Sequence, residues 1–345
     1  MKASVLTKIG RIELQQVPNP KLAADSDVLI RLKAVGICGS DIHYYRTGRI
    51  GSQIIHSPFT VGHEGSGIVM ETGAAVKRVK RGDRIAIDPS VSCGHCDQCR
   101  SGREHTCRTN LFVGCPDQIS GCLCEYIVLP EQCCFPITDR MSFEQGALTE
   151  PLSIGVYSVK KSQPLPGMSA AILGAGPIGM SVFHVLRTMD TSAVFITDKI
   201  DDRLKAAESL RPAWSGNPTM ADVVSEIIKR EPLMIDVVYE CTGDLAAIAQ
   251  GIELLKPGGK LVLVGVPEVD DVTFPIHELR RKEITIINIR RQVHCTQSAI
   301  DLLAQRRVAM DPMVTHRFPL EEAGTAFDLV ANYRDGVMKA MITLE

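Results

Sequence analysis

The chain has 345 residues, a formal net charge of −2 and a sequence pI near 6.5. This length favours two domains over one, and hydrophobic residues at 45% with charged residues at 23% are typical of a globular protein. A charge so close to zero gives no electrostatic reason to expect nucleic acid or an anionic membrane surface as a partner.

The N-terminal stretch MKASVLTKIGRIELQQV has no unbroken apolar run, and no later stretch is apolar for long enough to cross a bilayer. We therefore expect a cytoplasmic protein with no signal peptide and no membrane partner. Twelve cysteines in a reducing compartment are not expected to form disulfides. Seven of them lack regular spacing and are expected to be small buried residues: Cys115, Cys122, Cys124, Cys133, Cys134, Cys241 and Cys295.

The first 150 residues predict a β-rich domain with long loops. The stretch DVLIRLKAV alternates apolar and polar positions from Val28 to Ala34, which is the period of a half-buried strand. GSGIVMETG and DRIAIDP are similar short strand patterns bounded by Gly, Asp and Pro.

Three potential metal ligands lie in this region, in GICGSDIHYYRTGRIG and VGHEGSG. Cys38, His63 and Glu64 offer one sulfur, one nitrogen and one oxygen donor. Three protein ligands with a position left for water or substrate are typical of a catalytic zinc site. A lone cysteine and a GHE triplet can also be incidental, so their spacing alone is a modest signal.

A denser cysteine cluster follows at CGHCDQCRSGREHTC, residues 93–107. Its spacing is C-x2-C-x2-C-x7-C, with the cysteines at Cys93, Cys96, Cys99 and Cys107. Four thiolates with short gaps can complete a tetrahedral shell around zinc and leave no position for substrate. This cluster therefore predicts a structural zinc, with His95 and His105 expected at the surface or beside the ligands.

From about Pro164 the pattern changes to strands that alternate with helices, which implies a parallel sheet with crossover helices. Two helical patterns and a strand, GVMKAMITL, end the chain. The alternating segments are SAAILGAGPIGMSVFHVL, AVFITD, DDRLKAAESL, MIDVVYECTG, DLAAIAQGIELLK, GKLVLVG and EITIINI.

The turn GAGPIG, with Gly174, Gly176 and Gly179, has the spacing of a dinucleotide-binding turn. The first glycine allows the tight turn, the second lets the backbone approach a pyrophosphate, and the third lets helix and strand pack closely. The turn follows a predicted strand and opens a helix, and Asp198 ends the next strand about 20 residues on. A glycine-rich turn without a ligand is the alternative interpretation.

Asp198 indicates which dinucleotide is bound. Its carboxylate can accept hydrogen bonds from the ribose hydroxyls of NAD and would repel a 2′-phosphate. Lys199 and Arg203 are close enough in the sequence to meet such a phosphate, so NADP remains the alternative. NAD is the expected cofactor.

With these motifs, and with LTEPLSIGVYS, ECTG and VTHRFPLEEA, nearly the whole chain resembles the zinc-dependent medium-chain dehydrogenases, and their polyol group most closely. The resemblance implies an α/β protein with two domains. A GroES-like catalytic domain would comprise residues 1–152 and be completed by 291–345. A Rossmann NAD-binding domain would comprise 153–290.

The resemblance also implies roles for single residues. Cys38, His63 and Glu64 fall on the catalytic zinc ligands, and Glu150 falls on a glutamate that holds the zinc-bound water or becomes a ligand itself. Tyr44, Glu150 and Arg291 fall on substrate-contacting positions. Ser40 and His43 fall on proton-relay positions, with ordinary loop hydrogen bonding as the alternative. Expected cofactor contacts are Gly174, Gly176, Ile178, Gly179, Asp198, Arg203, Val264, Gly265, Val266, Ile289, Arg290 and Arg291.

The implied activity is NAD-dependent oxidation of a secondary hydroxyl of a polyol such as sorbitol or xylitol. The resemblance also implies two zinc ions per subunit, one catalytic and one structural. It further implies a homo-oligomer, and a tetramer is favoured over a dimer. The chain departs from sorbitol dehydrogenases at Arg290 and Gln292, where they carry phenylalanine and tyrosine. Its four-cysteine cluster is shared with idonate and threonine dehydrogenases. Sugar-acid and threonine oxidation are therefore alternatives, as is a catalytically silent protein that binds zinc and NAD.

Overall fold

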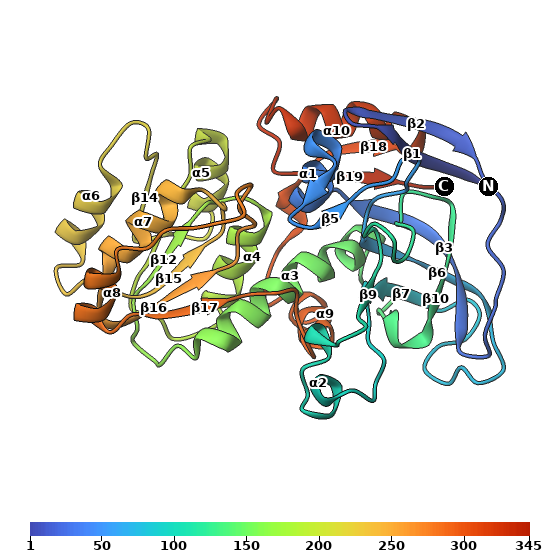
Figure 1. The fold of residues 1–345 in the computed structure, drawn as a ribbon, viewed down its shortest axis with the longest axis horizontal. Helices are drawn as coiled ribbons and strands as arrows, with labels where there is room; N and C mark the ends of the chain where they lie inside the picture. Colours follow the sequence, from blue (N-terminus) through green and yellow to red (C-terminus); the bar gives the residue numbers. More distant parts are fainter. The chain divides into compact units, whose positions relative to one another are not determined.

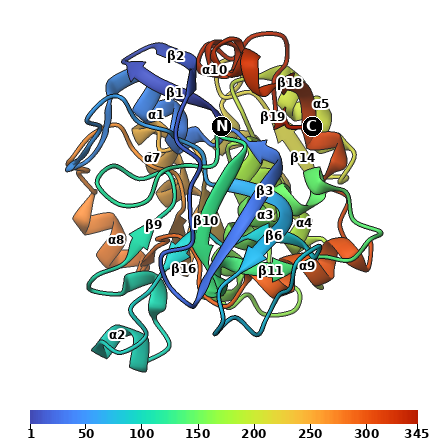
Figure 2. The ribbon, with the colours of Figure 1, turned by 90° about the vertical axis from the view of Figure 1, so that its right-hand side faces the viewer.

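Antiparallel strand pairing builds the first of two units in the computed structural model, which describes residues 1–345. Unit 1 comprises residues 1–150 and 296–345, and unit 2 comprises 151–295. Seven strands of unit 1 form one sheet in the order β11-β7-β6-β3-β19-β18, with β10 also paired to β3 (Figures 1 and 2). They are β3 (Asp27–Gly36), β6 (Glu64–Thr72), β7 (Arg84–Ile87), β10 (Tyr126–Pro130), β11 (Cys134–Pro136), β18 (Val314–Pro319) and β19 (Lys339–Thr343).

Strand β3 is the centre of this sheet because it has neighbours along both of its sides. Its alternating residues Val28, Ile30 and Leu32 are buried in the core of unit 1, as the sequence pattern predicts. It pairs with β6 on one side, and with β10 and then β19 on the other. At the end of the β3–β6 pair, Gly36 lies opposite Glu64. This register brings the segment after β3 next to the segment before β6.

Shorter strands and helices complete unit 1. A loop containing α2 projects beyond the sheet strands in Figure 2. Helix α3 (Phe143–Ser162) begins in unit 1 and ends in unit 2. The remaining elements of unit 1 are β1 (Lys2–Lys8), β2 (Arg11–Gln16), α1 (Gly39–Thr47), β4 (Arg49–Ile50), β5 (Gln53–Ile54), β8 (Ser90–Val91), α2 (Asp97–Arg100), β9 (Leu111–Phe112), α9 (Thr296–Ala304), α10 (Ala323–Ala331) and short 3-10 turns.

Unit 2 contains a parallel sheet of six strands in the order β14-β13-β12-β15-β16-β17. Helices alternate with these strands along the chain (Figure 1). The strands are β12 (Ala170–Leu173), β13 (Val194–Thr197), β14 (Trp214–Gly216), β15 (Ile235–Glu240), β16 (Leu255–Leu263) and β17 (Thr285–Asn288). The helices are α4 (Pro177–Leu186), α5 (Asp201–Glu208), α6 (Val223–Arg230), α7 (Leu245–Leu254) and α8 (Ile276–Lys282).

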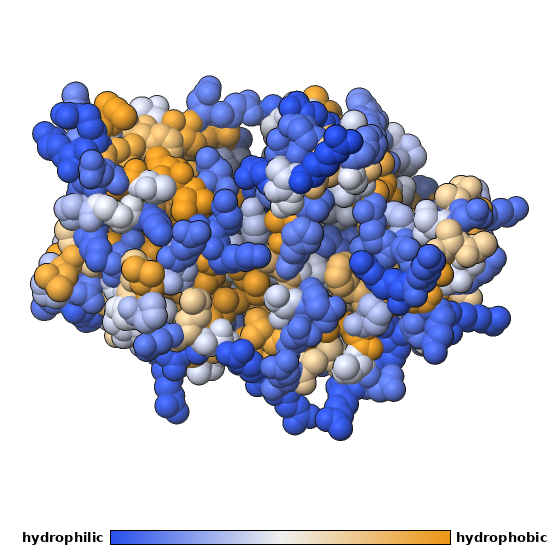
Figure 3. Space-filling view, turned by 90° about the horizontal axis from the view of Figure 1, so that it is seen from below, coloured by the Kyte–Doolittle hydropathy of each residue, from blue (hydrophilic) through white to orange (hydrophobic).

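The expected fold class, a β-rich unit and a parallel α/β unit, is confirmed. The short strand β14, helix α6 and the long helix α3 were not predicted from the sequence. No helix of the structure is long and apolar enough to cross a membrane. Polar residues cover most of the face shown in Figure 3, with apolar patches between them.

Candidate functional site

The fold brings Cys38, His63 and Glu64 together in unit 1. Their potential ligand atoms all lie within 4.8 Å of one another. Cys38 precedes α1 directly, whereas His63 and Glu64 lie at the start of β6, so the register of β3 and β6 creates the group. We call it the three-ligand site. Sulfur, imidazole nitrogen and carboxylate oxygen are all donors that zinc accepts, and three of them leave a fourth position for another ligand.

Asp41, which the sequence analysis did not identify, supports two members of this site. It is fully buried, its Oδ1 lies 3.4 Å from Nδ1 of His63, and its Oδ2 accepts a hydrogen bond of 3.0 Å from the amide of Cys38. Burial lowers the pKa of His63, but Asp41 and Cys38 raise it, and the net shift is upward. A carboxylate behind a metal-binding histidine fixes the orientation of its ring. The pattern Cys-x-x-Asp at a helix start was the available signal.

Lys339 is a second residue that the sequence analysis missed. It is 2% exposed, and its Nζ donates hydrogen bonds to Oε1 and Oε2 of Glu64 at 2.7 and 2.8 Å and to the carbonyl of Ile37 at 3.0 Å. Burial lowers the pKa of Lys339, but Glu64 raises it, and the net shift is upward. A buried carboxylate needs such a partner because its desolvation is costly. A single lysine in the apolar strand β19 was the signal for it.

Glu150 lies outside the group of three donor atoms, although its charge interacts with theirs. It is buried on α3. Burial is the main cause that raises the pKa of its carboxyl; His63 and Lys339 lower this pKa and Glu64 raises it, and the net value is about 7. A carboxyl group with a pKa near neutrality can both accept and donate a proton at physiological pH.

Helix α1 carries the other expected site residues of unit 1. Ser40 and His43 are partly exposed, whereas Tyr44 is buried. The Tyr44 hydroxyl lies 3.3 Å from Oε1 of Gln53 and 3.7 Å from Sγ of Cys115. Phe112, for which the sequence held no signal, packs its ring 5.4 Å from that of His63. Phe112 is therefore an aromatic neighbour of the three-ligand site.

The four cysteines of residues 93–107, which we call the four-cysteine lobe, also converge. The sulfur of Cys99 lies 3.9 Å from that of Cys93 and 3.5 Å from that of Cys96, and the sulfurs of Cys96 and Cys107 are 3.8 Å apart. A tetrahedral zinc with Zn–S distances of about 2.3 Å separates its sulfurs by about 3.8 Å. The lobe therefore fits a zinc ion closely.

The histidines of the lobe lie outside this group of four sulfurs. His95 is exposed and its Nδ1 hydrogen-bonds to the carbonyl of Cys93, whereas His105 is buried. None of the twelve cysteines of the chain forms a disulfide. Of the seven without regular spacing, six are buried and Cys241 is partly exposed, in agreement with their expected role as small apolar side chains.

In unit 2 the glycine turn joins β12 to α4. Gly174 has a φ of +104°, and a Cβ at Gly179 would lie 1.8 Å from the carbonyl oxygen of Gly174. Both positions therefore require glycine. Gly176 is the N-cap of α4, with Pro177 in the first turn and Ile178 partly exposed beside it. The turn thus presents a helix N-terminus of the kind that binds phosphate groups.

Asp198 follows β13 and lies close to this turn. Its Oδ2 accepts a hydrogen bond of 2.7 Å from the amide of Ala175, and its Oδ1 accepts one of 2.8 Å from the amide of Ile200. Arg203 extends over the turn, with Nη1 3.3 Å from the point where a Cβ of Gly176 would be. Lys199 forms an ion pair with Asp244. Arg203 is therefore the cation next to the turn.

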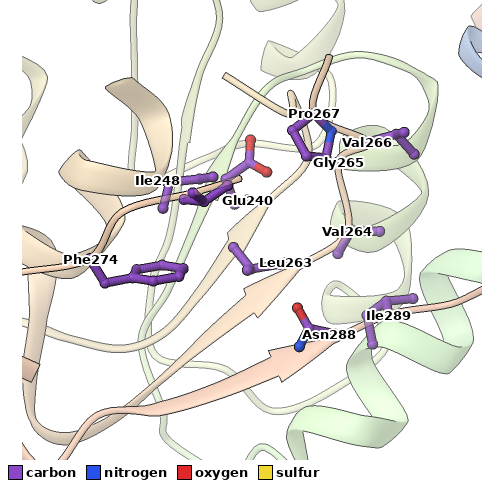
Figure 4. A pocket seen from close by; sticks show the side chains of 11 residues that line it. Glu240, Ile248, Leu263, Val264, Gly265, Val266, Pro267, Phe274, Asn288 and Ile289 are labelled. Atoms are coloured by element: carbon purple, nitrogen blue, oxygen red, sulfur yellow. The ribbon is translucent and has the colours of Figure 1, made fainter. Parts of the chain in front are cut away.

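The other expected cofactor residues lie at the ends of β16 and β17. Val264, Gly265, Val266 and Ile289 line a pocket of about 440 Å³ in unit 2 (Figure 4). Arg290 is exposed and Arg291 is partly exposed. Gln292 is buried, and its Oε1 accepts a hydrogen bond from the amide of Cys295, so this side chain is directed to its own backbone.

Each of the two units contains residues that match a known protein family. Residues 24–139 match the family described as "Alcohol dehydrogenase GroES-like domain", and residues 177–305 match that described as "Zinc-binding dehydrogenase". The first match contains the three-ligand site and the four-cysteine lobe. The second begins within the glycine turn, at residue 177, and contains Gly179 and Asp198.

Curated relatives match over nearly their whole length. A sorbitol dehydrogenase of Gallus gallus is 38% identical over 94% of this chain and 92% of its own length. An L-idonate 5-dehydrogenase of Vitis vinifera is 31% identical over 99% of this chain and 94% of its own length. Among solved structures, a zinc-binding dehydrogenase from Sinorhizobium meliloti bound to NADP is 30% identical, with a TM-score of 0.90 over 99% of this chain and 98% of that one.

Proposed function

This chain belongs to the zinc-dependent medium-chain dehydrogenases and is similar to their polyol group. We therefore propose that it uses NAD to oxidise a secondary hydroxyl of a polyol, such as sorbitol or xylitol, to a ketone. Membership of this family makes it a zinc-binding, nicotinamide-dependent alcohol dehydrogenase. The convergence of Cys38, His63 and Glu64 on one point is the observation that carries the proposal.

In unit 1, Cys38, His63 and Glu64 would hold the catalytic zinc, and the four-cysteine lobe would hold a structural one. Bound zinc would supply a Lewis acid that polarises the oxygen of the substrate hydroxyl. Glu150 would orient this hydroxyl and a neighbouring one, since a carboxyl with a pKa near 7 can accept or donate a hydrogen bond. Tyr44 would contact the same substrate, and Ser40 and His43 would pass the proton on towards solvent.

In unit 2, the glycine turn, Asp198 and the segments Val264–Val266 and Ile289–Arg291 would hold NAD, the hydride acceptor. Asp198 supports NAD over NADP because its carboxylate would repel a 2′-phosphate. Arg203 would meet the pyrophosphate rather than a 2′-phosphate, since it lies over Gly176. A ratio of kcat/KM for NAD to that for NADP well above one is expected. A preference for NADP would overturn this assignment.

Oxidation of a sugar acid is the second candidate. The grapevine L-idonate 5-dehydrogenase is 31% identical to this chain, and the exposed Arg290 together with Arg291 could pair with a substrate carboxylate. Gln292 is bonded to Cys295 and so offers less to a substrate than a tyrosine would. Threonine oxidation is disfavoured because threonine dehydrogenases carry aspartate at the position of Glu150.

A panel of polyols, sugar acids, sugar phosphates, threonine and ethanol, followed by NADH absorbance, tests the proposal. Polyols with neighbouring hydroxyls should be oxidised far faster than ethanol, because a site that pairs several hydroxyls leaves polar groups unpaired when they are absent. A sugar acid as the best substrate would favour the second candidate. No NADH with any substrate would support a silent zinc- and NAD-binding protein.

We also propose a cytoplasmic homo-oligomer, with a tetramer favoured over a dimer. Strand β17 is an edge strand of the sheet of unit 2, so its outer backbone groups are available for pairing. Val269 and Ile276, which precede this strand in the chain, are exposed apolar side chains of the kind that subunit interfaces cover. Light scattering of the purified protein would give the subunit number, and a monomer would contradict the proposal.

A further inference from the structure

Two turns of unit 2 meet at the carboxyl ends of β15 and β16, and Glu240 joins them. Glu240 is the last residue of β15 and is 1% exposed. Its backbone carbonyl accepts hydrogen bonds of 2.8 and 2.9 Å from the amides of Val264 and Gly265. The segment 264–266, which follows β16, is therefore attached to the end of the neighbouring strand.

The side chain of Glu240 holds the turn that follows it, residues 241–243. Its Oε1 accepts hydrogen bonds from the amide of Thr242 at 2.6 Å, the hydroxyl of Thr242 at 2.5 Å and the amide of Gly243 at 2.9 Å. Three donors on one buried oxygen fix the conformation of this turn, because none of them has another acceptor if the carboxyl is removed.

The turn 241–243 and the segment 264–266 touch through their backbones. A Cβ at Gly265 would lie 2.1 Å from the amide nitrogen of Gly243, and a Cβ at Gly243 would lie 2.4 Å from the carbonyl oxygen of Val266. No side chain separates the two segments. A displacement of the turn must therefore displace the segment as well.

The same turn reaches the dinucleotide turn and the neighbourhood of Asp198. The Cγ2 atom of Thr242 lies 2.6 Å from the point where a Cβ of Gly174 would be. The hydroxyl of Thr242 accepts a hydrogen bond of 2.8 Å from the amide of Asp244, and Asp244 pairs with Lys199, which follows Asp198. Glu240 thus supports a turn that contacts the segments after β12 and β16 directly, and that is linked to the segment after β13 through Asp244.

The second carboxylate oxygen, Oε2, is buried and has no hydrogen-bond partner. Figure 4 shows the Glu240 carboxyl between Ile248 and the turn of Gly265 and Pro267, in the wall of the pocket. Burial raises the pKa of Glu240, which favours the neutral carboxylic acid. A glutamine has nearly the same shape as that neutral acid and can make the same hydrogen bonds through its amide oxygen.

We propose that Glu240 is a positioning residue for the dinucleotide, because its carboxyl sets the geometry of the turn 241–243 and, through it, of the segment 264–266 and of Gly174. This inference rests on the proposed function of unit 2 as the NAD-binding unit. It adds a residue that does not touch the cofactor itself, and it explains why a buried acid stands where an apolar side chain would pack.

The test is the dissociation constant of NADH, measured by fluorescence with the full-length protein and without substrate. Glu240→Gln should bind NADH within about twofold of wild type, because the acceptor is kept. Glu240→Leu should bind about tenfold more weakly or worse, since three donors lose their acceptor. Thr242→Val, which keeps the methyl contact with Gly174 and removes the hydroxyl, should fall between them and decides the matter if Glu240→Leu does not fold.

Tyr239→Phe is the matched control. Tyr239 directly precedes Glu240, and its buried hydroxyl forms a hydrogen bond of 2.6 Å with the hydroxyl of Ser162. The substitution removes this bond and leaves the hydrogen bonds of the turn 241–243 in place. Its melting temperature should fall while its affinity for NADH stays at the wild-type value. Unchanged binding in Glu240→Leu or in Thr242→Val would overturn the proposal, and so would equal weakening in Tyr239→Phe, which would indicate general destabilisation.

With substrate present, Glu240→Leu should raise the KM for NAD while kcat stays within a few-fold of wild type, because chemistry occurs once the cofactor is bound. The two proposals fail in different ways. Wild-type protein that binds neither NADH nor NADPH would contradict the proposed function. If wild type and Glu240→Leu bound NADH equally tightly, only the proposed role of Glu240 would be contradicted, and the proposed function would stand.

Discussion

The four-cysteine lobe and the three-ligand site lie in the same unit and assemble their donors in opposite ways. The lobe takes all four sulfurs from fifteen consecutive residues, and no strand of the central sheet contributes to it. The three-ligand site takes Cys38 from the end of one strand and His63 and Glu64 from the start of its neighbour. A buried aspartate and a buried lysine stand directly behind it.

This difference shows what each site requires of the fold. A closed shell of four thiolates needs only a short loop, because the ligands satisfy the metal by themselves. An open site with three ligands must be held by the surrounding structure, and its buried charges need partners before any metal binds. The predictions below test this contrast, from the largest expected effect to the smallest.

His63→Ala should lower kcat about a thousandfold, because it removes one ligand and with it a Lewis acid that contributes several kcal/mol. Binding of NADH, followed by fluorescence, should stay at the wild-type level, since the glycine turn and Asp198 belong to unit 2. Activity above a tenth of the wild-type value would show that His63 does not hold the catalytic metal.

Lys339→Met should lower the free energy of unfolding of the metal-free protein by about 3–5 kcal/mol, because Glu64 is left as a buried charge without its partner. Urea denaturation in the presence of a chelator measures this change. Lys205→Met, which removes an exposed ion pair with Asp202, is the control and should have little effect. Equal stability of the two variants would mean that Lys339 does not support the site.

Asp41→Asn should lower the affinity for zinc, or the activity, by about 10–100-fold. The substitution removes the charged partner of the His63 ring and leaves His63 itself in place. Competition with a chromogenic chelator measures the retention. Asp27→Asn, which changes a carboxylate that caps a surface loop, should retain zinc as wild type does. If Asp41→Asn also did so, Asp41 would have only a capping role.

His95→Ala should change neither zinc content nor melting temperature beyond the effect of an ordinary surface substitution, about 0.5 kcal/mol. His95 is exposed, and its ring bonds to a backbone carbonyl rather than facing the four sulfurs. Mass spectrometry of the purified variant and its melting curve test this. Loss of one zinc from His95→Ala would make this histidine a ligand and the four-cysteine shell incomplete.

Features formed by consecutive residues could be predicted from the sequence, whereas features that depend on contacts between distant segments could not. The lobe, the glycine turn and the alternation of strands and helices are local patterns, and spacing alone identifies them. Asp41 and Lys339 become functional only through contacts made by the fold, and Lys339 is 275 residues from Glu64 in the chain. Strand β14 has only three residues, too few to show a period. Helix α6 was overlooked although Val223, Val224, Ile227 and Ile228 have the spacing of one helix face.

Zinc content, measured by mass spectrometry on wild type, His63→Ala and Cys99→Ser beside their kinetics, tests the division between the two sites most directly. We expect two zinc ions per wild-type chain and one in each variant. Cys99→Ser should melt at a lower temperature, because metal binding and the ordering of its loop are coupled, yet its folded fraction should keep a largely normal KM. If Cys99→Ser abolished turnover while its stability and second zinc stayed unchanged, the lobe would be the catalytic centre and this account would be wrong.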